Sequence, residues 1–142
     1  MRTFYIFKIN KDYSKIARDI PSTLYSAYLN IKMSTTNNLN QLYNEYFSLT
    51  EILPKKDLNS FIFSNFKQKD GYSIYKNKHV FNNYYTDESS KLIINNSYMI
   101  LKSNVPNSTF LSFISKIPNI FIIDFDNNDY FWLANYRNLR LV

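Results

Sequence analysis

Phe121-Ile122-Ile123-Asp124-Phe125 is the most strongly β-prone stretch of the sequence and predicts a strand. The fold class follows from this strand together with the segments around it. The polar residues 126–129 follow as a turn, after which Tyr130-Phe131-Trp132-Leu133 predicts a second strand. At the other end of the chain, residues 3–9 are again rich in aromatic and β-branched side chains and predict a further strand. We expect these terminal strands to lie near each other in one sheet.

Residue spacing in the first half of the chain predicts helices. We expect them over residues 11–18, from Pro21 onward, over 38–53 and over 55–66. Asn10 has a side chain suited to cap the first of these helices. One side of that helix is expected to hold Tyr13, Ile16 and Ala17. Pro54 is expected to end the third helix, because the residue before a proline is held away from helical geometry.

Shorter segments follow the turn signal around Gly71. They predict strands over residues 72–75, 79–85, 91–95 and 97–102, followed by a helix over 108–117. The sequence therefore predicts a single α/β domain over residues 1–142, with a mixed central sheet flanked by helices.

The scarcity of glycine, cysteine and histidine excludes many kinds of site. Gly71 is the only glycine, so phosphate-binding loops and the nucleophile elbow, which need two or more, are absent. The chain has no cysteine, which excludes disulfides, thiol catalysis and cysteine-bound zinc. His79 is the one histidine, so a site built from several histidines is excluded as well. We therefore expect no metal and no cofactor.

Basic residues outnumber acidic ones by 17 to 11, which gives a net charge of +6. Such a balance fits contact with nucleic acid or with another acidic partner. It also fits AT-rich coding, which favours lysine, and on this preferred interpretation no direct nucleic-acid contact is expected. Apolar runs such as residues 120–123 are far shorter than the roughly 20 residues of a membrane span. We expect a cytoplasmic protein without membrane contact.

Two groups of side chains could carry chemistry. Asp124, Asp126 and Asp129 could hold a hard cation after a strand, but they miss the diagnostic positions of the EF-hand loop. An acidic turn is the preferred interpretation. His79 could act as a general base, although a surface or half-buried structural histidine fits its strand context better.

The tyrosine content indicates a binding surface. Thirteen tyrosines exceed what a core of this size can hold, so some of them must be exposed. Exposed tyrosine is enriched at protein–protein contacts. This favours a binding module over an enzyme.

The two ends of the chain together resemble a known family. The opening is an aromatic strand, Phe4-Tyr5-Ile6-Phe7-Lys8-Ile9, with a basic–acidic step leading to Tyr13 at the head of a helix. The close is Asp124-Phe125, a four-residue spacer and Tyr130-Phe131-Trp132-Leu133. The order and separation of these motifs are similar to those of the sporulation inhibitor of replication (SirA) family of spore-forming Gram-positive bacteria. The resemblance covers about a third of the chain.

The resemblance implies a non-catalytic protein that binds the N-terminal domain of the replication initiator DnaA and limits new rounds of chromosome replication. It also implies a fold similar to the GCN5-related N-acetyltransferases. Catalytic members of that fold hold coenzyme A with a Gly-rich loop, which a chain with Gly71 alone cannot form. Two alternatives stay open: an acetyltransferase-like enzyme without the usual loop, and a basic nucleic-acid-binding module.

The resemblance places the initiator-binding surface on the early helices. Carried over by position, this surface comprises Tyr13, Ala17, Glu45 and Ser48. Ala17 and Ser48 are smaller than the aromatic residues of the family, so the contact could have moved to Tyr43 or Tyr46. The closing motif is expected to determine the fold through Asp124, Phe125, Tyr130, Trp132 and Leu133.

Overall fold

The computed structural model describes residues 1–34 and 38–133. Its helices are α1 (Lys11–Ala17), α2 (Pro21–Met33), α3 (Leu39–Leu49), α4 (Lys55–Phe66) and α5 (Thr109–Ile114). Its strands are β1 (Arg2–Lys8), β2 (Tyr72–Tyr75), β3 (Lys78–Asn83), β4 (Glu88–Ile94), β5 (Met99–Ser103), β6 (Ile120–Asp124) and β7 (Asp129–Trp132). Each predicted helix and strand is present, with ends that differ by a few residues.

The strands form one sheet in the order β2-β3-β4-β5-β1-β6-β7. Tyr5 of β1 pairs with Ile100 on one side and Ile123 on the other, so the expected proximity of the terminal strands is confirmed. Every strand pairing in the described residues is antiparallel, and the predicted mixed sheet is wrong. The crossover from β5 through α5 to β6 does connect two parallel strands. They do not pair, because β1 lies between them.

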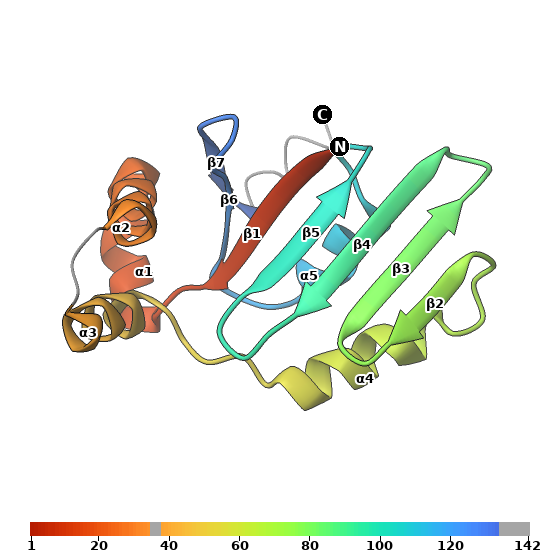
Figure 1. The fold of residues 1–142 in the computed structure, drawn as a ribbon, viewed down its shortest axis with the longest axis horizontal. Coiled ribbons are helices and arrows are strands. Elements are labelled where there is room, and N and C mark those ends of the chain that lie inside the picture. The colour runs from red at the N-terminus through yellow and green to blue at the C-terminus, as the bar shows by residue number, and fades with distance from the viewer. Residues whose placement is uncertain (35–37, 134–142) are drawn as a thin grey trace.

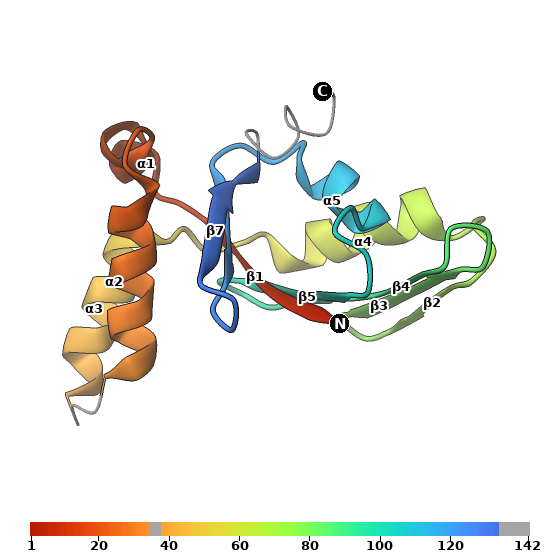
Figure 2. The same cartoon turned by 90° about the horizontal axis from the view of Figure 1, so that it is seen from above.

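Helices cover both faces of the sheet, but over different parts of it (Figure 1). α4 and α5 pack on one face, where the rings of Phe66 and Phe110 stack with centroids 4.8 Å apart (Figure 2). α1, α2 and α3 lie on the other side, at the end formed by β1, β6 and β7. There Phe7, Phe121 and Trp132 belong to a second apolar cluster with residues of these helices. The sheet therefore separates two cores of unequal extent.

The helix starts follow the sequence signals. The side chain of Asn10 accepts a hydrogen bond from the backbone N–H of Asp12 at 3.0 Å, and Pro21 occupies the first turn of α2. The predicted apolar side of α1 is wrong at Ile16, which is exposed. Ala17 is buried and Tyr13 is half-buried, in agreement with the prediction, and Ser14 is buried in place of Ile16.

Helix α3 ends at Leu49, earlier than Pro54 predicts. Thr50 adopts an extended conformation and forms a β-bridge with Ile9. The backbone N–H of Asn10 donates to the carbonyl of Leu49 at 2.7 Å. Pairing with the segment that follows β1 therefore ends the helix before the proline can.

Arg2 joins the ends of β6 and β7. Its Nε donates to Asp124 and its Nη2 donates to Asp129, both at 2.8 Å. Burial alone would raise the pKa of Asp124, but hydrogen bonds from Asn127 and Arg2 together hold it below its usual value. The carboxylates of this acidic turn thus bind an arginine of β1.

Gly71 lies in the turn before β2, with φ of +86°. A Cβ at this position would come within 2.0 Å of the carbonyl oxygen of Asn82. That close approach lets the backbone N–H of Asn82 donate to the Gly71 carbonyl at 3.0 Å. The only glycine of the chain therefore serves a tight turn at the edge of the sheet, as its sequence context predicted.

The single histidine, His79, is fully buried, so the predicted surface or half-buried position is wrong. Its Nδ1 lies 2.8 Å from the hydroxyl of Tyr72, and its Nε2 lies 2.7 Å from Oδ1 of Asn59. Because Oδ1 only accepts, Nε2 carries the proton and Nδ1 accepts from the tyrosine. Burial lowers the pKa of His79 to about 4. A neutral imidazole thus links β3 to α4.

We expect Gly71→Ala to lower the free energy of unfolding by about 2 kcal/mol or more, because alanine combines a strained φ with a backbone clash. Urea denaturation of the wild type and the variant measures this difference. Ser73→Ala, at an exposed position of β2, is the matched control and should change the value by less than about 0.5 kcal/mol. Equal stability of Gly71→Ala and the wild type would contradict the turn geometry.

We also expect stability to fall as the solution is acidified from pH 7 to pH 5. The unfolded chain protonates His79 near its ordinary pKa of 6.5, whereas the folded chain keeps it neutral down to about pH 4. Protons then favour the unfolded state, at a cost of about 2 kcal/mol over this interval. Denaturation curves at several pH values measure the slope. In His79→Gln the slope should flatten, and an unchanged slope would contradict the assignment.

Candidate functional site

Helix α3 exposes an apolar stripe. Leu39, Tyr43 and Phe47 follow one another at four-residue spacing, so they lie on one side of the helix. Their exposed fractions are 62%, 61% and 42%. The rings of Tyr43 and Phe47 are almost parallel, at 10°, with centroids 6.2 Å apart. Exposed large apolar side chains in a continuous row are typical of a docking surface.

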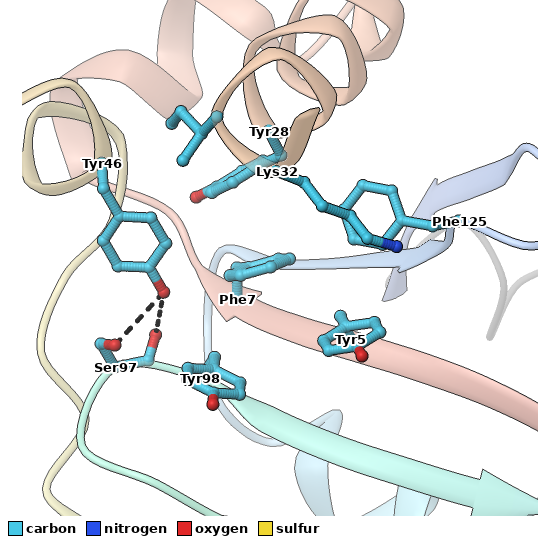
Figure 3. Close-up of a pocket in the computed structure, with 9 residues that line it drawn as sticks. Tyr5, Phe7, Tyr28, Lys32, Tyr46, Ser97, Tyr98 and Phe125 are labelled. Carbon is cyan, nitrogen blue, oxygen red and sulfur yellow. Dashed lines mark hydrogen bonds between the residues drawn. The ribbon is translucent and has the colours of Figure 1, made fainter. Parts of the chain in front are cut away.

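An aromatic pocket lies beside this stripe, between α2, α3 and the sheet (Figure 3). Its volume is about 280 Å³. The lining residues are Tyr5, Phe7, Tyr28, Ile31, Lys32, Tyr46, Ser97, Tyr98 and Phe125. They come from β1, α2, α3, the turn between β4 and β5, and the turn after β6. Five segments far apart in the sequence therefore build one concave, mostly apolar site.

The floor of the pocket is a stacked pair of rings. Phe7 and Tyr28 lie 4.1 Å apart between centroids, at 14° to each other. The hydroxyl of Tyr28 shares a hydrogen bond with that of Thr50, the residue directly after α3. Burial raises the pKa of Tyr28. This pair ties α2 to β1 and gives the pocket a rigid base.

Lys32 supplies the positive charge at the rim. Its ammonium nitrogen lies 4.3 Å from the ring centroid of Phe125 and 5.9 Å from that of Tyr5. Figure 3 shows the lysine reaching across the opening toward Phe125. The site thus combines aromatic walls with one cation, which suits an apolar or aromatic side chain next to a carboxylate.

Tyr46 connects the pocket with the stripe. Its hydroxyl donates to the carbonyl oxygen of Ser97 at 3.0 Å, and the Ser97 hydroxyl lies 3.2 Å away. Burial raises the pKa of Tyr46. A second hollow of about 270 Å³ shares Ile31, Tyr46 and Ser97 with the first and is also lined by the stripe residues and Leu42. We call the two hollows and the stripe together the aromatic surface.

The residues expected to bind a partner differ in their exposure. Tyr43 and Tyr46 lie on the aromatic surface, while Glu45 and Ser48 are exposed on α3. Tyr13 is half-buried against the second core. Ala17 is 2% exposed and packs in that core, so its side chain offers no contact area to a partner.

The closing motif mainly holds the fold together. Asp124 and Trp132 are buried, and Leu133 packs in the larger core. Tyr130 stacks on Tyr25 of α2 with centroids 4.6 Å apart. Phe125 differs from the other four, because it lines the pocket.

Several pocket residues were not singled out by the sequence. Phe7 and Phe125 belong to the terminal motifs and were expected to shape the fold, whereas Lys32, Ser97 and Tyr98 belong to no predicted site. These residues meet because α2 and the turns after β4 and β6 converge on β1. No local spacing pattern signals such a junction. The surplus of tyrosine was the one sequence feature that indicated an aromatic surface.

Within residues 1–34 and 38–133, no cluster of three or more histidine and carboxylate side chains could hold a metal ion. No helix in the same ranges is long and apolar enough to cross a membrane. The chain matched no protein-family model and no curated protein.

Tyr46→Phe should lower the free energy of unfolding by about 1 kcal/mol, because it removes the hydroxyl that binds Ser97 and leaves that carbonyl without its donor. Thermal or urea unfolding measures the loss. Tyr43→Phe on the same helix is the matched control, since its ring is exposed and its change should stay within about 0.5 kcal/mol. Equal effects of the two substitutions would contradict the role of Tyr46 as a link.

Proposed function

We propose that the chain is a non-catalytic regulator that binds another protein through its aromatic surface. The observation that carries the proposal is the exposed row of Leu39, Tyr43 and Phe47 beside an aromatic pocket. Interfaces take most of their binding energy from a few aromatic or apolar anchors inserted into pockets. The aromatic surface offers both elements: protruding rings on α3 and a cavity that can receive a side chain of the partner.

The partner that we propose is the N-terminal domain of the replication initiator DnaA, with inhibition of replication initiation as the result. This identity rests on the resemblance of the terminal motifs to the SirA family. The position of the aromatic surface supports it, because α3 is among the helices on which that family presents its partner-binding face. Tyr43 and Tyr46 replace the buried Ala17 as contact residues.

The pocket also defines the chemistry of the complementary side. Its walls are aromatic, and Lys32 provides a cation at the rim. A partner helix that inserts one apolar or aromatic side chain and places a carboxylate beside Lys32 satisfies both features. Glu45 and Ser48 are exposed on α3 but line neither hollow, so the proposed contact does not depend on them.

The place of Gly71 supports a binding role over acetyl transfer. A cofactor loop of the acetyltransferase kind needs backbone N–H groups that point at a pyrophosphate at the start of a helix. Gly71 instead lies in a tight turn that leads into β2 and is bound to Asn82.

Mixing the purified chain with the DnaA N-terminal domain should give a complex with a Kd in the micromolar range or tighter, measured by isothermal titration calorimetry. The double variant Tyr43→Ala/Phe47→Ala should weaken binding at least about 10-fold, because it removes two adjacent anchors. The absence of a complex with the wild-type chain would contradict the proposed partner.

Tyr84→Ala/Tyr85→Ala is the matched control, since it also removes two exposed tyrosines, from the turn between β3 and β4. Its affinity should equal that of the wild type. If the control weakens binding as much as the α3 variant does, the aromatic surface is not the docking site.

A further inference from the structure

One face of the sheet carries no helix over β2, β3, β4 and β5 in the described part of the chain. Figure 2 shows these strands edge-on, with α4 and α5 above them and nothing below. The helices α1–α3 cover the same side only at the β1, β6 and β7 end. We call the uncovered side of β2–β5 the open face.

The strand register defines which side chains lie on the open face. One row across the strands holds Ser73, Val80, Lys91, Lys102 and Thr3. The next row holds Tyr75, Lys78, Ile93, Ile100 and Tyr5. A third, shorter row holds Asn82 and Ser89. None of these residues is acidic, although the chain contains 11 acidic residues.

Lysines meet across the middle of this face. Lys91 of β4 and Lys102 of β5 are direct cross-strand partners, and both are exposed. Lys78 is also exposed, one strand further along in the neighbouring row. Like charges placed opposite each other destabilise a sheet. No carboxylate of the described residues forms an ion pair with these lysines, so an anion from outside the chain would relieve their repulsion.

The lysines alternate with flat or apolar side chains. Tyr75 is 70% exposed, and Ile93 and Ile100 are only half-buried although they lie in central strands. A duplex presents phosphates to a protein surface and keeps the faces of its bases stacked inside. A single strand presents phosphates together with unstacked bases, which pack on aromatic and apolar side chains.

We propose that the open face binds single-stranded nucleic acid. The phosphates contact Lys78, Lys91 and Lys102. The bases pack on Tyr75, Ile93 and Ile100. The five strands from β2 to β1 span about 19 Å at about 4.8 Å per strand, which suits a short segment of about four nucleotides. The open face adjoins the pocket of the aromatic surface at Tyr5. None of the three lysines, Tyr75, Ile93 or Ile100 lines either hollow, so variants of these residues test nucleic-acid binding independently of DnaA binding.

Fluorescence anisotropy with a labelled 12-nucleotide DNA of mixed sequence tests the proposal. With three lysine–phosphate contacts on a single strand, affinity should fall about 20-fold between 50 and 200 mM salt. In Lys91→Gln/Lys102→Gln, one contact remains and the fall should be only about 3-fold. The affinity of this variant at 50 mM salt should also be at least 10-fold below that of the wild type.

Lys15→Gln/Lys56→Gln is the matched control, because it removes the same charge from exposed positions of α1 and α4. It should bind the DNA as the wild type does. The proposal is overturned if the wild type does not bind at 50 mM salt, or if the control loses as much affinity as the open-face variant. Equal affinity for a 12-base-pair duplex, or tighter binding to phosphatidylserine vesicles than to DNA, would overturn it as well.

Discussion

The pairing of β1 on both of its edges is the interaction on which the rest of the structure depends. β5 and β6 lie far from β1 in the sequence, and both pair with it through antiparallel ladders. Side chains of β1 alternate between the two faces, so Phe4 and Ile6 enter one core while Phe7 enters the other. The first strand thus supplies side chains to both cores, as does its neighbour β6, whose Ile122 and Ile123 enter opposite ones.

This arrangement also explains where the surfaces lie. Continuing from β1, the chain places α1, α2 and α3 over its own side of the sheet, and the bridge between Ile9 and Thr50 anchors the end of α3 there. These three helices do not extend over β2–β5 on that side, so the lysine-rich face of β2–β5 stays uncovered. At the other end of the sheet, α3 exposes its apolar stripe and a pocket lies where α2 and α3 meet the sheet.

Local sequence patterns predicted the elements well and their arrangement only in part. The continuous β-prone run of β6 and the helical spacing of apolar residues in α3 depend only on residues nearby in the sequence, so both elements are predictable from it. The end of α3 at Leu49 depends on pairing with Ile9, 40 positions away, and no local pattern carries that information. The burial of His79 has the same origin, because its partners Tyr72 and Asn59 lie on different elements.

The candidate site was predictable to a similar degree. Tyr43 and Tyr46 could be singled out because the resemblance places the partner-binding surface on the early helices, and these aromatic residues are the alternatives there to the small Ala17 and Ser48. Tyr98 and Lys32 could not. Tyr98 joins the pocket when the turn between β4 and β5 packs against the segment after α3, where the N–H of Leu53 donates to the carbonyl of Asn96 at 2.7 Å. Lys32 joins it because α2 lies beside the turn after β6, with the ammonium nitrogen 4.3 Å from the ring centroid of Phe125. Sequence reasoning identified tyrosine as the surplus residue, and the fold determined which of the tyrosines form one surface.

Amide chemical-shift mapping of the isotopically labelled chain during titration with the DnaA N-terminal domain is the most direct test of the central claim. We expect the largest shifts on α3 and on the pocket around Tyr46 and Ser97, while β2 and β3 keep their resonances. Shifts confined to other elements, or no shifts at saturating concentrations of the partner, would contradict it.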